Sequence, residues 1–227
     1  MSAPGSDREV FLARLRERLS RPTRINLAHP LGSFDGQAPQ VRYTADLSDP
    51  VSAFAAAAER AMARVRRLPS ADGREGLVEL LREVVAAEKV RSAVLTGEPE
   101  VEGSGEILTG LGVGTAPYSV AAAAEADLGV TGAAWGIAAT GSLVVSAARA
   151  LGRGCSLVPR VHLALLPASR IVATMGDVVR NLDECFPEGL PSALVIVTGP
   201  SRSADIELEL TLGVHGPQSV WIGLLED

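Results

Sequence analysis

Close to its carboxyl end, the chain gathers hydroxyls, an arginine and a carboxylate in one short segment. The apolar run Leu194–Val197 is followed by Thr198, Gly199, Pro200, Ser201, Arg202, Ser203, Ala204 and Asp205. If a helix begins near Ser203, with 204–212 as its body, the free backbone N–H groups of its first turn could join the hydroxyls and the guanidinium around a carboxylate or phosphate. The segment therefore predicts a small-anion site, with candidate ligand-binding residues Thr198, Gly199, Ser201, Arg202 and Asp205.

The same residues also fit a structural role. Ser203 could serve only as a helix cap, and Asp205 only as a first-turn acid that complements the helix dipole. Arg202 could pair with Asp205 or Glu207 rather than with a ligand. The sequence leaves both interpretations open.

A second polar loop, Thr140-Gly141-Ser142, stands between apolar segments. Ligands of open α/β sheets bind outside the carboxyl ends of the strands, where successive loops converge. We therefore predict that Thr140, Gly141 and Ser142 line one concave site with the segment after Val197. His215, between Gly213 and Gly216, is the candidate general acid or base for this site, although no nucleophile can be placed beside it.

A third loop, Val158-Pro159-Arg160, joins the set because it adjoins an apolar strand and carries an arginine. His162 follows it closely. Its apolar surroundings favour a core histidine over a ligand-binding one.

Several function classes are excluded or disfavoured. No G-x-G-x-x-G or G-x-x-x-x-G-K-[ST] pattern is intact, so a dinucleotide or Walker-type site is unsupported. Three histidines without close spacing and two distant cysteines predict neither a metal site nor an iron–sulfur cluster in this chain. A net charge of -6 argues against nucleic-acid binding. The absence of a long apolar run argues against membrane insertion, so we expect a cytoplasmic protein.

Hydrophobic periodicity predicts an alternation of helices and strands. Helices are expected over 7–19, 51–65, 77–85 and 171–182, the last with Ser169 as its cap, and strands at Ser92–Leu95, Ser142–Ala147, Val161–Leu166, Ala193–Val197 and Ser219–Leu225. Short, nearly all-apolar strands indicate a sheet covered on both faces, so the fold class is α/β with a doubly wound, mostly parallel sheet. The segment 127–148 predicts a hairpin-like antiparallel addition, which makes the sheet mixed.

Two parts of the chain are distinguished. Residues 1–49 form an N-terminal helical arm and a polar tether, and residues 50–227 form the α/β domain. The apolar stripe of the arm (Phe11, Leu12, Leu15 and Leu19) must be covered by this domain, by a second copy in a homo-oligomer, or by a partner protein. The tether favours a protein–protein contact.

The second half of the chain resembles a known family. The runs VTGAAWGIAATGSLVVSAARALGRGCSLVPRVHLALLPASRIV and TGPSRSADIELELTLGVHGP resemble the LUD (lactate utilization) domain family, closest to its LutC branch. The family pattern usually reads ADTGT around residue 140. Here Ala139 and Ser142 replace the acid and the second threonine, so any role of that acid is lost.

The resemblance implies a NagB/RpiA/CoA-transferase-like fold and membership of a three-protein system that oxidises L-lactate to pyruvate. The implied partners are LutA-like and LutB-like iron–sulfur proteins, and the iron–sulfur clusters would reside in them, with no cofactor in this chain. Three functions stay open: an accessory or ligand-binding subunit of that system, an independent enzyme on a phosphorylated or CoA-linked molecule, and a purely structural interaction protein.

Overall fold

The structure is a computed structural model that describes residues 47–69, 73–147, 150–187, 189–204, 210–212 and 215–226. The predicted helix at 7–19 and most of the tether lie outside these residues, so the proposed division at residue 49 stays a prediction. No helix in the described ranges is long and apolar enough to cross a membrane.

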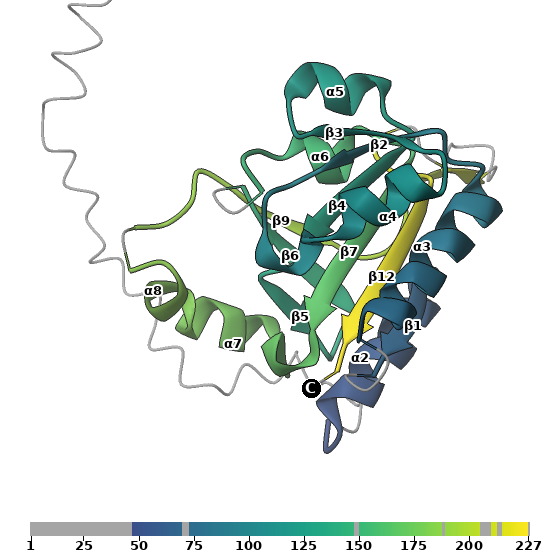
Figure 1. Ribbon diagram of the computed structural model, residues 1–227. Helices are drawn as coiled ribbons and strands as arrows, with labels where there is room; N and C mark the ends of the chain where they lie inside the picture. Colours follow the sequence, from purple (N-terminus) through teal and green to yellow (C-terminus); the bar gives the residue numbers. More distant parts are fainter. Residues whose placement is uncertain are drawn as a thin grey trace, which may run out of the picture. The chain divides into compact units, whose positions relative to one another are not determined.

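Helical elements and strands largely alternate up to residue 132, whereas strands follow one another at 128–146 and among the described residues from 194 onward (Figure 1). In chain order, the helical elements are α2 (Pro50–Arg60), α3 (Gly73–Glu88), η1 (Pro99–Val101), α4 (Ser104–Gly110), α5 (Val120–Glu125), α6 (Gly154–Leu157), η2 (Ala168–Arg170), α7 (Met175–Arg180) and α8 (Leu182–Cys185). The strands are β1 (Arg64–Leu68), β2 (Ser92–Leu95), β3 (Gly114–Pro117), β4 (Leu128–Gly132), β5 (Trp135–Ile137), β6 (Ser142–Ser146), β7 (Val161–Pro167), β8 (Ile171–Val172), β9 (Leu194–Val197), β10 (Arg202–Ala204), β11 (Leu210–Leu212) and β12 (Ser219–Leu225).

The central sheet has six strands in the order β1-β12-β7-β4-β2-β3, and every neighbouring pair is parallel. Alternate residues of β7 show why its sequence is almost entirely apolar. Leu163 and Leu165 pack with residues of α3 and α4, whereas Ala164 and Leu166 pack with α2 and with the neighbouring smaller sheet. Both faces are thus buried, and the predicted mostly parallel α/β class is confirmed.

The antiparallel addition forms a separate four-stranded sheet, β8-β5-β6-β9. The predicted hairpin is β5–β6, in which Trp135 pairs with Val144. Strand β9 runs antiparallel to β6, so Leu194–Val197 belongs to this smaller sheet and not to the parallel one. Strand β4, the first part of the expected hairpin segment, instead joins the central sheet between β2 and β7.

Two predicted helices have different bounds. The helix expected over 171–182 with a Ser169 cap is wrong in its first part, because Ile171–Val172 is strand β8, and α7 begins only after Thr174, whose side chain forms a capping box with Asp177. The helix expected to reach Val65 ends at Arg60, and Val65 lies in edge strand β1. In both places apolar residues recur at the spacing typical of a helix, but pairing with distant strands places them in a sheet.

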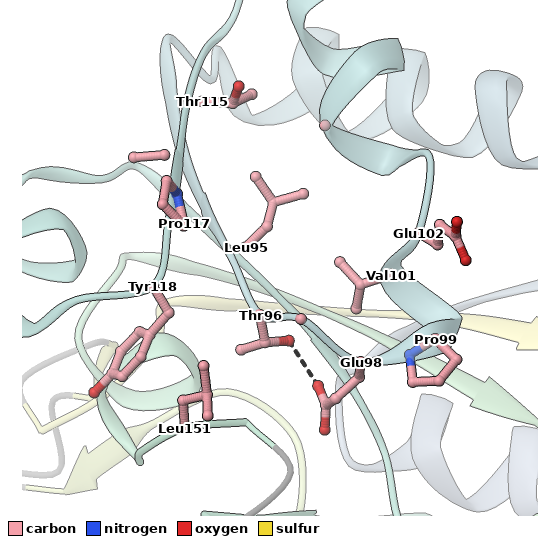
Figure 2. A pocket seen from close by; sticks show the side chains of 13 residues that line it. Leu95, Thr96, Glu98, Pro99, Val101, Glu102, Thr115, Pro117, Tyr118 and Leu151 are labelled. Carbon is pink, nitrogen blue, oxygen red and sulfur yellow. Dashed lines mark hydrogen bonds between the residues drawn. The ribbon is translucent and has the colours of Figure 1, made fainter.

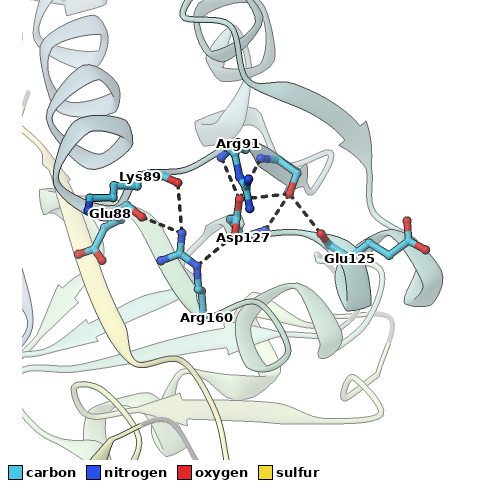
Figure 3. A network of polar contacts seen from close by, with 7 residues as sticks. Glu88, Lys89, Arg91, Glu125, Asp127 and Arg160 are labelled. Carbon is cyan, nitrogen blue, oxygen red and sulfur yellow. Dashed lines mark hydrogen bonds and ion pairs between the residues drawn. The ribbon is translucent and has the colours of Figure 1, made fainter.

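Arg160 ties together elements at the amino-terminal edge of the sheet (Figure 3). Its Nε donates to Asp127 Oδ1 at 3.1 Å, and its Nη2 donates to the Glu88 carbonyl, at the end of α3, at 2.7 Å. A cation there also complements the helix dipole. The loop Val158–Arg160 precedes β7, at the amino-terminal edge of the central sheet. There the Arg160 carbonyl accepts hydrogen bonds from the Gln218 and Ser219 N–H groups, at 2.8 and 3.2 Å.

Asp127 is the acceptor at the centre of this network, with hydrogen bonds from Arg160 and from the backbone N–H groups of Arg91 and Ser92. Burial raises the pKa of the Asp127 carboxyl, but the backbone N–H of Arg91, the Arg160 guanidinium and the Ser92 N–H outweigh it, so the pKa lies below its ordinary value. The carboxylate therefore stays ionised and bonded to the starts of β2 and β7 at neutral pH.

His162 is a core histidine, as its apolar surroundings predicted. The side chain is fully buried, and its Nε2 lies 2.9 Å from Thr131 Oγ1. Its Nδ1 has no hydrogen-bond partner, and burial lowers the pKa of the imidazole to about 4. The ring is neutral in the folded protein at neutral pH.

Replacing Arg160 by Ala should lower the free energy of unfolding by roughly 2 kcal/mol, because charge-assisted hydrogen bonds to a carboxylate and a helix end are lost. Arg160→Lys should recover only part of the loss. Urea unfolding followed by circular dichroism measures the change. Arg66→Ala is the control, since Arg66 is about half exposed in its contacts with Glu79 and Glu83 and should change stability by less than about 0.5 kcal/mol. Equal effects of the two variants would contradict the anchoring role.

Stability should fall as the pH drops from 6.5 toward 4, because the unfolded chain protonates His162 near its ordinary pKa of 6.5 while the folded chain resists protonation down to about 4. This contribution is fully present above pH 6.5. His162→Asn, which keeps a polar partner for Thr131, should show a flatter profile in chemical denaturation at pH 4.5 and 7. Parallel profiles for the two proteins would remove His162 as the cause.

Candidate functional site

Three of the predicted site residues form a continuous row of hydroxyls. Thr140 Oγ1 lies 2.7 Å from Ser142 Oγ, which lies 2.7 Å from Thr198 Oγ1. The row exists because β6 and β9 are antiparallel, with Leu143 opposite Val197, so the start of one strand adjoins the end of the other. Ser142 is buried, whereas Thr140 and Thr198 are exposed and face solvent.

The glycines of these two loops permit close contact with the end of α2. Gly141 and Gly199 have φ angles of 67° and 73°, in the left-handed region. A Cβ at Gly141 would lie 2.1 Å from the Ala58 nitrogen, and one at Gly199 would lie 1.9 Å from the Ala61 carbonyl oxygen. Their local role is therefore steric, and the hydroxyl row sits beside the carboxyl end of α2.

Arg202 and His215 are both exposed. Arg202 Nη1 lies 3.8 Å from Met62 Sδ, just beyond the end of α2, so the guanidinium is near the same helix end as Gly141 and Gly199. Ser201 N donates to the Pro217 carbonyl at 2.8 Å, which brings this loop beside the segment that follows His215. Asp205 lies outside the described residues.

The helix expected from Ser203 is wrong. Arg202–Ala204 is strand β10, and it pairs antiparallel with β11, Arg202 lying opposite Leu212. In the sequence, residues 206, 208, 210 and 212 are apolar and alternate with polar ones, a period of two that is typical of strands. The first-turn N–H donors of a helix are thus lost, and an anion here would rely on the Arg202 guanidinium and the hydroxyls.

The strand order creates a second candidate site. Strand β2 is followed by β3 on its outer side, whereas β4, on its other side, leads back toward β7. Connections that diverge in this way leave a crevice at the carboxyl ends of β2 and β4, where α/β proteins commonly bind ligands. Beside it, at the carboxyl ends of β2 and β3, a cavity of about 600 Å³ opens (Figure 2), lined by Leu95, Thr96, Gly97, Glu98, Pro99, Val101, Glu102, Gly105, Thr115, Ala116, Pro117, Tyr118 and Leu151.

Glu98 links the two sides of the crevice. Its Oε2 accepts a hydrogen bond from the Gly132 N–H and another from Thr96 Oγ1, each at 2.6 Å. In the same loop, Glu100 forms an ion pair with Arg170, whose Nη1 also donates to the Ala133 carbonyl at 3.2 Å. Buried charge pairing thus fixes the segments after β2, β4 and β7 relative to one another.

Cys155 lies next to the strands β2 and β4 as a buried thiol. Its thiol donates to the carbonyls of Val94 and Val130, each at 3.5 Å. Burial, with a smaller contribution from the charge of Glu98, raises the pKa of the thiol to about 12. Since the thiolate is the nucleophile, Cys155 has a packing role. In the described ranges, no group of three or more His, Cys, Asp or Glu side chains is arranged to hold a metal ion.

Sequence reasoning missed this cavity although its signal was present. The strand Ser92–Leu95 was predicted correctly and is followed directly by Thr96-Gly97-Glu98-Pro99. Polar residues after an apolar strand are the same pattern that selected Thr140 and Thr198. The charges of this loop are acidic, however, whereas the predicted anion site requires an arginine or hydroxyls.

Comparison with known proteins agrees with the resemblance. The family model of the LUD domain matches residues 120–225. This part of the chain is thus similar to the LUD domain family. The hydroxyl row and Arg202 lie within the matched LUD residues, whereas Leu151 is the only lining residue of the cavity that does so.

Curated relatives of this chain carry the name lactate utilization protein C. The protein from Halalkalibacterium halodurans is 39% identical over 107 residues, which cover 46% of each chain. The Bacillus subtilis protein is 36% identical over 107 residues, covering 46% of this chain and 45% of its own. The chain thus aligns with about half the length of the curated relatives it matches.

A solved structure shares the fold over a longer range. The crystal structure of a DUF162 family protein from Deinococcus radiodurans aligns with a TM-score of 0.57 and 21% identity, over 80% of this chain and 99% of that one. The similarity extends the shared α/β fold well beyond the LUD match.

The anion-binding prediction for Arg202 can be tested with inorganic phosphate and L-lactate as probes. Arg202→Ala should weaken the binding of either anion about tenfold or more, since a charge-assisted contact contributes roughly 1.5–3 kcal/mol. The melting temperature should hardly change because the side chain is exposed. Isothermal titration calorimetry and thermal melts measure the two effects.

Two variants complete this test. Arg202→Lys should restore affinity only partly. Arg180→Ala removes an exposed arginine of α7 that pairs with Asp177, and it should leave anion affinity unchanged. Unchanged affinity in Arg202→Ala, or an equal loss in Arg180→Ala, would argue against a site at Arg202.

Proposed function

We propose that this chain is the LutC-like component of a cytoplasmic L-lactate utilization system, in which it works with LutA-like and LutB-like iron–sulfur proteins. The observation that carries the proposal is its 39% identity over 107 residues to a lactate utilization protein C. The residues that match the LUD family model include the hydroxyl row and Arg202, the candidate contacts for a small carboxylate.

The chemistry of lactate oxidation suggests different tasks for this chain and for its iron–sulfur partners. Oxidising a hydroxy acid removes two electrons, which side chains do not accept by themselves, so such reactions use flavin, nicotinamide or metal centres. In the proposed system the iron–sulfur partners carry these electrons. This chain would bind a small anion through Arg202 and the Thr140, Ser142 and Thr198 hydroxyls, and would contact its partners.

A reconstitution assay tests this role. The purified chain alone should not reduce a dye such as dichlorophenolindophenol with L-lactate, whereas the chain together with LutA-like and LutB-like proteins should do so. Omitting this chain from the mixture should lower the initial rate at least tenfold, and a deletion strain should grow poorly on L-lactate but normally on pyruvate.

Three results would contradict the proposal. Lactate-dependent dye reduction by the isolated chain would make it the catalyst and not an accessory subunit. A rate that does not change when the chain is omitted would remove it from the system. Equal growth defects on lactate and pyruvate would place its role after lactate oxidation.

A further inference from the structure

Polar side chains around the cavity at the carboxyl ends of β2 and β3 are bonded within the protein. Thr96 Oγ1 donates to Glu98 Oε2, which also accepts the Gly132 N–H, and Glu98 has a further polar or ionic interaction within the chain. Glu98 is also buried, with 4% of its surface exposed. Thr115 Oγ1 lies 3.2 Å from Thr109 Oγ1. These groups form part of the cavity wall and need no ligand to satisfy them.

Tyr118 contributes an aromatic ring whose polar end is also occupied by the protein. Its hydroxyl accepts a hydrogen bond from the Gly154 N–H at 3.2 Å, which fastens the side chain to the start of α6. A Cβ at Gly152 would lie 2.5 Å from the same hydroxyl oxygen, so the chain before α6 packs closely around it. The ring lines the cavity (Figure 2), and aromatic rings attract other rings by stacking or edge contact.

Leu151 adds an unusual apolar contact at the same wall. It has a φ of 55°, in the left-handed region that non-glycine residues seldom adopt, and 70% of its surface is exposed. A leucine held in this conformation and exposed at a cavity mouth is better accounted for by contact with an occupant than by packing within the chain.

The remaining walls are apolar or lack a side chain. Figure 2 shows Pro117 next to Tyr118, and Val101 on the opposite side of the cavity. A Cβ at Gly97 would meet no atom within 4 Å, so free space adjoins the loop after β2. The volume of about 600 Å³ lies within the range of small-molecule sites. An occupant would therefore be recognised by its shape and its apolar surface.

The charges of the lining residues favour a neutral occupant. An anion would lie near the carboxylates of Glu98 and Glu102, and the described lining residues include no lysine, arginine or histidine to offset them. A cation would gain little, because Glu98 is bonded within the protein and Glu102 is exposed at the rim, where water screens its charge. Either ion would also lose hydration among apolar walls, whereas a neutral molecule avoids this cost.

We propose that this cavity binds a small neutral molecule with a flat aromatic body, whose ring lies between Tyr118 and Leu151 on one side and Val101 on the other. The site is distinct from the Arg202 region, and it concerns binding by this chain alone. It goes beyond the role in lactate utilization and does not depend on it.

Three naphthalene derivatives provide matched probes, since they share the aromatic body and differ in charge at neutral pH. 2-Naphthylmethanol is neutral, 2-naphthoate is an anion, and 2-naphthylmethylamine is a cation. Saturation-transfer NMR titrations with the full chain should show the alcohol binding at least threefold more tightly than either ion, and L-lactate should not displace it. A smaller preference, or tighter binding of either ion, would overturn the proposal.

Four variants locate the bound alcohol, and thermal melts establish that each is folded. Gly105→Leu should fill the cavity and abolish binding; a Cβ at Gly105 makes only an ordinary 3.9 Å contact with Leu95, so α4 should tolerate it. Leu151→Asn should lower affinity at least threefold without destabilising the chain, because asparagine adopts a positive φ more readily than leucine. Glu102→Gln should leave affinity unchanged. Val120→Thr, at an exposed apolar residue of α5 outside the lining set, should also leave it unchanged.

The outcomes separate this site from other apolar contacts and from the lactate role. Binding of 2-naphthylmethanol that survives both Gly105→Leu and Leu151→Asn would place the probe elsewhere and overturn the site. Equal losses in Val120→Thr and Leu151→Asn would show non-specific apolar contact, and a large loss in Glu102→Gln would show recognition by charge; both contradict the proposal. A chain required for lactate-dependent dye reduction that does not bind the alcohol would overturn the site while leaving the proposed function intact.

Discussion

Two glycines of β4 allow neighbouring segments to lie unusually close to this strand, and the rest of the domain depends on that close packing. A Cβ at Gly129 would lie 1.9 Å from the Cys155 carbonyl oxygen, and one at Gly132 would lie 2.8 Å from Glu100 Oε2. Any larger residue would push α6 or the loop after β2 away from the central strand. Because glycine has no side chain, the start of β4 can pack against the backbone of α6, and its end can pack against the carboxylates of Glu98 and Glu100.

The same approach explains why charged groups can be buried at the end of this strand. The Gly132 N–H is free to donate to Glu98, and Arg170 joins Glu100 to the Ala133 carbonyl. The buried carboxylate of Glu98 is thereby offset by hydrogen-bond donors, and that of Glu100 by a cation. The crevice between β2 and β4 is consequently fixed by three loops that are distant in sequence.

A second organising point is the carboxyl end of α2. The loops containing Gly141 and Gly199 come from different strands, yet both pack on the same helix end, and Arg202 contacts Met62 just beyond it. The protein thus has two distinct polar regions: the first contains the Arg202 guanidinium and the hydroxyl row, and the second contains the carboxylates and the Tyr118 ring that line the cavity.

The sequence by itself determined the fold class, because strands buried on both faces must be apolar throughout. Ser92–Leu95 and Ser219–Leu225 were therefore predicted with the bounds that the structure has. Edge strand β1 could not be predicted in the same way, because its Arg64-Val65-Arg66-Arg67 segment is largely solvent-exposed and need not be apolar. Local spacing also failed at β8 and β10, where long-range pairing outweighed a weak helical pattern.

Only the tertiary structure decided where the candidate sites lie. The polar loops at 140 and 198 could be selected by residue type, but their union into one hydroxyl row depends on the β6–β9 pairing, which joins residues 56 positions apart. The cavity at Glu98 depends on the placement of β4 between β2 and β7, a strand order that no local pattern encodes. Residue types fix what chemistry each loop can offer, whereas non-local strand pairing decides which loops meet.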